Sequence, residues 1–206
     1  MKVERKADHA VSEASCKEAT GKSLADWFKA LDKHGGIELG RRNLDNWVQE
    51  KHQVDAWWSK TIVNEYEIAR GVLAKDGKPK GYSICPTKNI KASPKKCFEA
   101  FATAKALDAW FGPRHDLDLR EDGHWRNADG NRATIKKVNA GKNIRLIAED
   151  EGLTLPTPVE IKFTPNGANC TVMISIERLQ TRAEADGYRR AWSEALDRLK
   201  EFIEAR

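Results

Sequence analysis

Along the chain, large apolar residues follow two different spacings, and the change falls near residue 75. From residue 23 to residue 70 they recur every three or four positions, which is the repeat of one face of an α-helix. From residue 115 onward, short runs alternate between apolar and polar residues and end at Gly, Pro, Asn or Asp, as strands separated by turns do. We therefore predict a helical part followed by a part that is rich in strands.

Three helices are predicted in the first part. The first begins after Ser23, a good N-cap residue, and ends at Gly35–Gly36. The second begins after Asn43, and the third extends from Val54 to Gly71. So short a bundle has little room for a core, and bulky aromatic side chains are expected to fill it. These are Trp27, Trp47, Trp57 and Trp58.

The second part follows a linker, "KDGKPKG" at 75–81, in which Gly and Pro stand among charges. A first strand is expected within 82–92, and "SPKKCFEAFATAKALDAWFGP" is typical of a helix pair that starts at a Ser cap and ends at Gly-Pro. Six strands and a long amphipathic C-terminal helix, which contains Tyr188 and Trp192, come next. The six strands are predicted at 115–120, 123–128, 131–138, 143–150, 158–164 and 168–178.

These patterns divide the chain into four segments. A flexible polar tail is expected over 1–17 and a small all-α bundle over 18–74. The linker 75–81 then leads to a domain over 82–206 that mixes helices with strands. The predicted fold class is α+β with a preceding helical bundle.

The domain at 82–206 resembles the START-like (SRPBCC) superfamily, and within it the branch of activators of the heat-shock-90 ATPase. The resemblance is carried by "IKASPKKCFEAFATAKALDAWFGP", the "DGHW" step and "YRRAWSEALDRLKEF". Two steps depart from the pattern, since Asp122–Gly123 replaces Gly-Gly and Ala191–Trp192 replaces Gly-Trp. Residues 18–73 resemble a small, uncharacterised bacterial helical domain.

The resemblance implies a helix-grip fold, in which a curved antiparallel sheet surrounds a long C-terminal helix and an elongated apolar cavity lies between them. It does not fix the chemistry, because these families include lipid carriers, cyclases, hydrolases and cochaperone-like proteins. Apolar residues in such a position also serve plain packing, which remains the alternative for each of them. The expected lining is Phe101, Trp110, Phe111, Trp125, Ile135, Ile147, Met173, Trp192 and Leu196.

The sequence gives weaker evidence for polar groups that would anchor a ligand than for the apolar lining. Arg126, Arg132 and Arg145 fall on predicted strands and are able to hold an acidic head group, although arginines on exposed strands are commonly just solvated. His115 and His124 lie near two aspartates, but the spacing matches no metal site. We therefore predict no metal ligands, no cofactor and no assigned catalytic residue.

Charge and composition exclude several classes of partner. The net charge of +5 is spread over the chain without a basic stripe along a helix, so nucleic-acid binding is not expected. "TGKS" at 20–23 is only half of a phosphate-binding loop, and Ser23 already has a role as a cap. No run approaches the ~18 apolar residues of a membrane span, and the N-terminus has no secretory apolar core. A cytoplasmic protein with reduced cysteines is expected.

The sequence thus predicts non-covalent binding of a small hydrophobic or amphipathic molecule between sheet and helix. An enzyme that acts on such a ligand in the same cavity is the first alternative. A chaperone-regulator-like module without a ligand is the second. Trp57 and Trp58 are adjacent and cannot share one helix face, so a protein partner or self-association through the helical domain also stays open.

Overall fold

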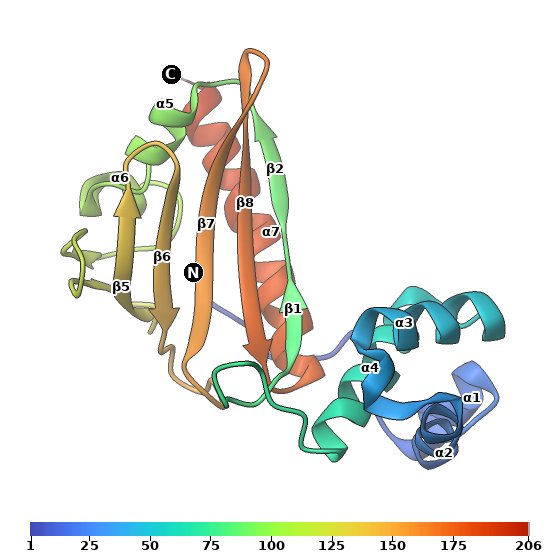
Figure 1. Ribbon diagram of the computed structural model, residues 1–206. Coiled ribbons are helices and arrows are strands. Elements are labelled where there is room, and N and C mark those ends of the chain that lie inside the picture. The colour runs from blue at the N-terminus through green and yellow to red at the C-terminus, as the bar shows by residue number, and fades with distance from the viewer. Residues whose placement is uncertain (206) are drawn as a thin grey trace. The chain divides into compact units, whose positions relative to one another are not determined.

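A computed structural model describes residues 1–205, and within it the chain divides into two compact units. The helical unit comprises Ala7–Tyr82. The sheet unit comprises Met1–Lys6 together with the chain from Ser83 onward. Figure 1 shows the helices of the first and the long-stranded sheet of the second.

The helical unit has one helix more than the sequence analysis predicted. Ser12 caps the additional helix through a reciprocal pair of hydrogen bonds with Ser15, and Cys16 packs fully buried in the core. Ser23 caps the next helix as expected, by accepting a hydrogen bond from the Asp26 amide at 3.2 Å. The helices are α1 (Glu13–Thr20), α2 (Leu24–His34), α3 (Arg41–Asn46) and α4 (Ala56–Ala69), with single turns at Gly36–Leu39 (3-10) and Trp47–Lys51 (π).

Two helix starts in this unit differ from the prediction for local reasons. The helix α3 begins after Gly40, and the Asn43 side chain donates a hydrogen bond to the Leu39 carbonyl oxygen instead of capping. The helix α4 begins after Asp55, whose carboxylate accepts hydrogen bonds from the amides of Trp57 and Trp58. A carboxylate at this position satisfies amides that have no partner within the helix.

The sheet unit is a single antiparallel sheet against which helices pack. The strands lie in the order β1-β8-β7-β6-β5-β4-β3, and β2 also pairs with β8. The single strand predicted within 82–92 is therefore two short strands, β1 and β2, which both pair with β8. The strands are β1 (Tyr82–Ile84), β2 (Thr87–Ile90), β3 (Asp116–Leu117), β4 (His124–Arg126), β5 (Arg132–Asn139), β6 (Asn143–Ala148), β7 (Thr157–Asn166) and β8 (Asn169–Leu179).

Helix α7 (Arg182–Glu204) lies along one face of this sheet, where it runs beside β8 and β2 (Figure 1). Thr181 and Glu184 form a capping box at its start. The short helices α5 (Pro94–Glu99) and α6 (Ala104–Asp108) complete the unit. The antiparallel sheet that holds a long C-terminal helix confirms the predicted α+β helix-grip fold.

Residues 1–17, which the sequence analysis assigned to a flexible tail, are divided between the two units. Residues 13–17 belong to α1. Met1 is buried in the sheet unit with 4% of its surface exposed, and Arg190 of α7 donates hydrogen bonds to the carbonyl oxygens of Glu4 and Lys6. Within residues 1–205, none of the helices has the length and apolar character that crossing a membrane requires.

Replacing Ile62 by Ala should destabilise the helical unit by about 2–5 kcal/mol, because Ile62 is fully buried and its truncation leaves a cavity. Hydrogen exchange of peptides from the two units, read by mass spectrometry, measures the effect separately in each. Ile68→Ala is the matched control: the same change on the same helix, at a residue that is 40% exposed, should cost about 0.5 kcal/mol or less. Equal losses of protection in the two variants would contradict this assignment of the core.

Candidate functional site

A small cavity lies between the sheet and the first turns of α7. Its floor consists of two rows of side chains that cross neighbouring strands: Ala133 pairs with Ala148, and Leu146 pairs with Val159, which pairs with Ile176. Side chains alternate between the faces of a strand, so these residues share the face toward α7.

Aromatic residues close the other sides of the cavity. Tyr188 and Trp192 stand four residues apart on α7 and therefore face the sheet together. The Phe111 ring lies 5.1 Å from the Trp192 ring and 5.2 Å from the Trp125 ring, as measured between centroids. The space left free is about 40 Å³, which is small beside the ~150 Å³ cavity that holds a benzene molecule. Met1 is one of the residues that line this space.

The carboxylate of Asp150 marks the polar end of the cavity. Its Oδ2 atom accepts hydrogen bonds from the Tyr188 hydroxyl at 2.7 Å and from Asn131 Nδ2 at 3.1 Å, and its Oδ1 atom accepts from the Arg132 amide at 2.7 Å. Burial raises the pKa of the Tyr188 hydroxyl, and the charge of Asp150 raises this pKa further. Tyr188 is therefore a fixed donor to Asp150 at neutral pH.

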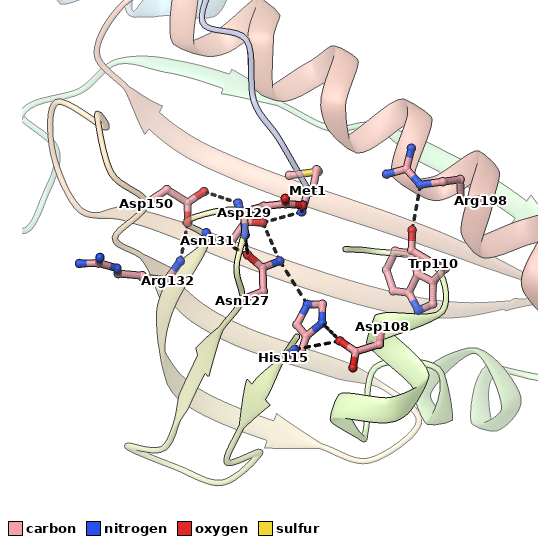
Figure 2. Close-up of polar contacts among 10 residues, drawn as sticks. All are labelled: Met1, Asp108, Trp110, His115, Asn127, Asp129, Asn131, Arg132, Asp150 and Arg198. Atoms are coloured by element: carbon pink, nitrogen blue, oxygen red, sulfur yellow. Dashed lines mark hydrogen bonds and ion pairs between the residues drawn. The ribbon is translucent and has the colours of Figure 1, made fainter. Parts of the chain in front are cut away.

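A chain of hydrogen bonds continues from Asn131 to the end of α6 (Figure 2). Asn127 Nδ2 donates to Asn131 Oδ1 at 3.0 Å and lies 3.3 Å from His115 Nε2. Asp108 Oδ1 accepts from the His115 amide at 2.8 Å and lies 2.7 Å from His115 Nδ1. This arrangement assigns the proton to Nδ1, so that Nε2 accepts from Asn127.

Burial sets the ionisation of this histidine. The His115 side chain is fully buried, and burial lowers its pKa, although the hydrogen bond to Asp108 and the charge of that carboxylate act in the opposite direction. The hydrogen bonds from His115 hold the pKa of Asp108 below its usual value. His115 does not line the cavity, and its Nε2 atom is within hydrogen-bonding distance of Asn127.

The amino group of Met1 completes the polar end. It donates to Asp129 Oδ2 and to Asn131 Oδ1, both at 2.7 Å (Figure 2). Burial lowers the pKa of this amine, whereas the hydrogen bond and the charge of Asp129 act in the opposite direction. The site therefore combines an apolar slot with acceptors that hold an ammonium group.

Three of the nine predicted lining residues, Phe111, Trp125 and Trp192, line the cavity. Phe101 and Trp110 are buried beside it in the same aromatic cluster, with ring centroids 4.8 Å apart. The remaining four do not line it. They are Ile135 and Leu196, which are fully buried, and Ile147 and Met173, which are half-buried on the sheet face turned away from α7.

Of the three arginines predicted to anchor a ligand, only one lies at the cavity. Arg132 lines the cavity, Arg126 is exposed, and Arg145 is paired with Glu160 at 3.0 Å. In the part of the chain that the structure describes, no group of three or more His, Cys, Asp or Glu side chains is placed to hold a metal ion. His124 is instead paired with Asp116, at 3.0 Å between Nε2 and Oδ2.

Sequence reasoning missed the polar end of the site. Asn127, Asp129 and Asn131 all fall in the turn "NADGN", whose composition predicts a turn and no more. Asp150 lies two residues after Ala148, the last residue of β6, where a polar residue is unremarkable. The only available signal was Tyr188, a polar hydroxyl on the apolar stripe of α7, since a buried Tyr hydroxyl needs a partner.

Replacing Tyr188 by Phe should make the free energy of unfolding of the sheet unit fall less steeply as the pH rises into the alkaline range. In the folded protein the pKa of Tyr188 lies above the unfolded value of about 10. The stabilisation that Tyr188 provides is therefore complete below pH ~10 and is lost as the pH rises from the unfolded toward the folded pKa. Urea unfolding between about pH 8 and pH 11 measures the slope. Tyr66→Phe, in the helical unit, is the control: its pKa is raised to about 12, and its removal should leave the sheet unit unchanged. An unaltered slope in Tyr188→Phe would contradict the assignment.

Replacing Asp108 by Asn should move the pKa of His115 further down, because the carboxylate that partly offsets burial is removed. NMR of the His115 ring protons across an acid titration measures the change. Asp122→Asn, at an exposed carboxylate paired with Lys136, should leave the His115 titration in place. A pKa of His115 that rises in Asp108→Asn would show that the two groups are not coupled as described.

Comparison with known proteins places this fold in a family. Among curated proteins no sequence matches this chain. Among solved structures, CalU16 from Micromonospora echinospora is 20% identical with a TM-score of 0.52 over 59% of this chain and 75% of that one. The Aha1 dimer from Colwellia psychrerythraea is 17% identical with a TM-score of 0.54, over 60% and 96% of the two chains.

An HSP90 activator from Plasmodium falciparum is 13% identical with a TM-score of 0.55, over 60% of this chain and 97% of that one. Identities this low show a shared fold. The profile of one family, described as Activator of Hsp90 ATPase homolog 1-like protein, matches residues 91–204, which is more than half of the chain. This chain therefore belongs to the family of Activator of Hsp90 ATPase homolog 1-like proteins.

Proposed function

We propose that the sheet unit binds a small amphipathic molecule in the cavity between the sheet and α7. The observation that carries the proposal is the combination of an apolar slot with hydrogen-bonding groups gathered at one end. Sites for small molecules are commonly apolar, with a few polar groups that fix the orientation of the ligand. The apolar part here consists of Leu146, Val159, Ile176 and Trp192.

The ligand is small, since the free space is about 40 Å³. A larger space becomes available if the Met1 side chain leaves the lining. The apolar tail then lies on Leu146 and Val159, and the polar head lies near Asn131, where oxygen acceptors already converge.

Binding is favoured over catalysis by the state of the polar groups. A general acid or base needs a pKa near the working pH, but burial and Asp150 raise the pKa of Tyr188 away from neutrality. The Asp150 oxygens are already occupied by three donors. His115 lies behind the rings of Phe111 and Trp125 and does not itself line the cavity.

A protein partner is the second candidate, and the observation that favours it is the family match together with a neighbour described as an HSP90 activator. An apolar interface needs a contiguous exposed patch. In the described residues, the exposed large apolar side chains are Ile37, Ile68, Leu73 and Leu155, of which only Leu155 is in the sheet unit. Ligand binding therefore has more support in this unit.

An NMR titration of the full chain with 1-pentanol tests the proposal. We expect saturable shifts of the indole N–H signals of Trp125 and Trp192, which line the cavity. Replacing Leu146 by Trp should abolish these shifts, because the larger ring fills the slot. Ile147→Trp is the matched control, since its residue lies next in β6 on the opposite face.

Overpacking costs ~1–3 kcal/mol, so the amide spectra of both variants establish that they fold. Saturable shifts in the wild type and in Ile147→Trp, but not in Leu146→Trp, would support the cavity as the site. No saturable shift in the wild type, or equal behaviour of the two variants, would reject it.

A further inference from the structure

The Met1 amine occupies a site that is built from fixed groups. Asn131 is 7% exposed and Asp129 has a side chain that is 13% exposed, so both acceptors are largely removed from water. The Asn131 amide is held at both ends, because its Oδ1 accepts from Asn127 and its Nδ2 donates to Asp150. The oxygen that faces the amine therefore cannot rotate away without breaking other hydrogen bonds.

The backbone around Asp129 is fixed in the same way. Asn127 Oδ1 accepts hydrogen bonds from the amides of Asp129 and Asn131, at 3.0 Å and 3.2 Å. An Asn side chain that accepts hydrogen bonds from backbone amides a few residues later stabilises the turn between them. Both acceptors of the amine thus project from a turn whose shape is set by Asn127.

Gly112 leaves the room that the amine occupies. A Cβ atom at this position would lie 2.6 Å from the Met1 nitrogen and 2.7 Å from Asp129 Oδ2. Any other residue would therefore displace either the amine or the carboxylate. The glycine of the "FGP" step contributes a wall of the ammonium site.

The charge around the amine favours a cation. Burial lowers the pKa of the Met1 amine and the charge of Arg198 acts in the same direction, whereas the carboxylates of Asp129 and Asp150 favour the protonated form. Arg198 is itself held away by a hydrogen bond from its Nε atom to the Trp110 carbonyl oxygen at 2.9 Å (Figure 2). An anionic head group would meet two carboxylates at this end of the cavity.

The tail of Met1 shows what can follow the ammonium group. From the amine through Cα, Cβ, Cγ and Sδ to Cε, the residue has the length of pentylamine. Met1 is 4% exposed and lines the same cavity as Trp192 and Leu146. An ammonium group on the two acceptors thus carries an unbranched apolar tail into the slot.

We infer that this site binds small primary amines with an unbranched apolar tail, and that Met1 is an internal occupant which such a ligand displaces. The inference rests on the proposed function and assigns its ligand class. Charge-assisted hydrogen bonds to Asp129 and Asn131 select the amine, and the slot selects the length of its tail.

Titration of the full chain with pentylamine, 1-pentanol and pentanoate, followed by NMR, tests the inference. Charge-assisted hydrogen bonds are worth more than neutral ones, so pentylamine should bind roughly tenfold or more tightly than the other two. A chain with Gly-Ser ahead of Met1 converts the Met1 amine into an amide. Removing an internal competitor raises apparent affinity, so this chain should bind pentylamine more tightly still.

Two variants and a control locate the selectivity. Asp129→Asn and Gly112→Ala should lose the preference for pentylamine while they retain binding of 1-pentanol, which also shows that they are folded. Asp122→Asn, at an exposed carboxylate, should keep the preference.

The outcomes separate the two proposals. Equal affinities for the three probes in the wild type, or an unchanged preference in Asp129→Asn, would overturn the amine site and leave the cavity as a general binder. No binding of any probe, to the wild type or to the extended chain, would overturn both.

Discussion

The hydrogen bonds that Asp150 accepts join α7 to the sheet. The donors are the Tyr188 hydroxyl on α7, the Asn131 side chain in the loop before β5, and the Arg132 amide in β5 itself. Asp150 is half-buried, and a carboxylate that is partly withdrawn from water is stabilised and fixed in position by several donors. The start of the long helix is therefore held to the sheet by groups whose positions are mutually determined.

The cavity follows from this attachment. Tyr188 keeps the first turns of α7 at a fixed distance from β5 and β6, and small residues at Ala133 and Ala148 leave space beneath it. Farther along the helix, Ala195, Leu196 and Leu199 are fully buried. The cavity thus lies at the end of the helix where the polar chain is.

The sequence specifies the architecture well because its signals are local. Alternation of apolar residues, Ser93 before Pro94, and the amphipathic stripe of the last helix each report on a few neighbouring residues. The helix α1 was missed because its start depends on a reciprocal hydrogen bond between two serines, and Cys16 is its only buried residue.

The site was predicted only in part because it depends on long-range geometry. Phe111, Trp125 and Trp192, which were expected from the fold that the family resemblance implies, line the cavity. Ile147 and Met173 were expected in the lining but lie on the sheet face turned away from α7, since an apolar run does not say which face of a strand is inside and one residue changes the face. The polar chain links Met1 to Asn131 and Asp150 to Tyr188, contacts between residues far apart in sequence that no spacing rule reveals.

The central claim is that the polar end of this cavity holds a head group and the apolar slot holds its tail. The most direct measurement is a crystal structure of the chain with Gly-Ser ahead of Met1, grown with pentylamine. The account predicts the ammonium group within hydrogen-bonding distance of Asp129 and Asn131, with the tail along Leu146 and Trp192. An empty cavity, or pentylamine bound elsewhere with Met1 still in its place, would contradict it.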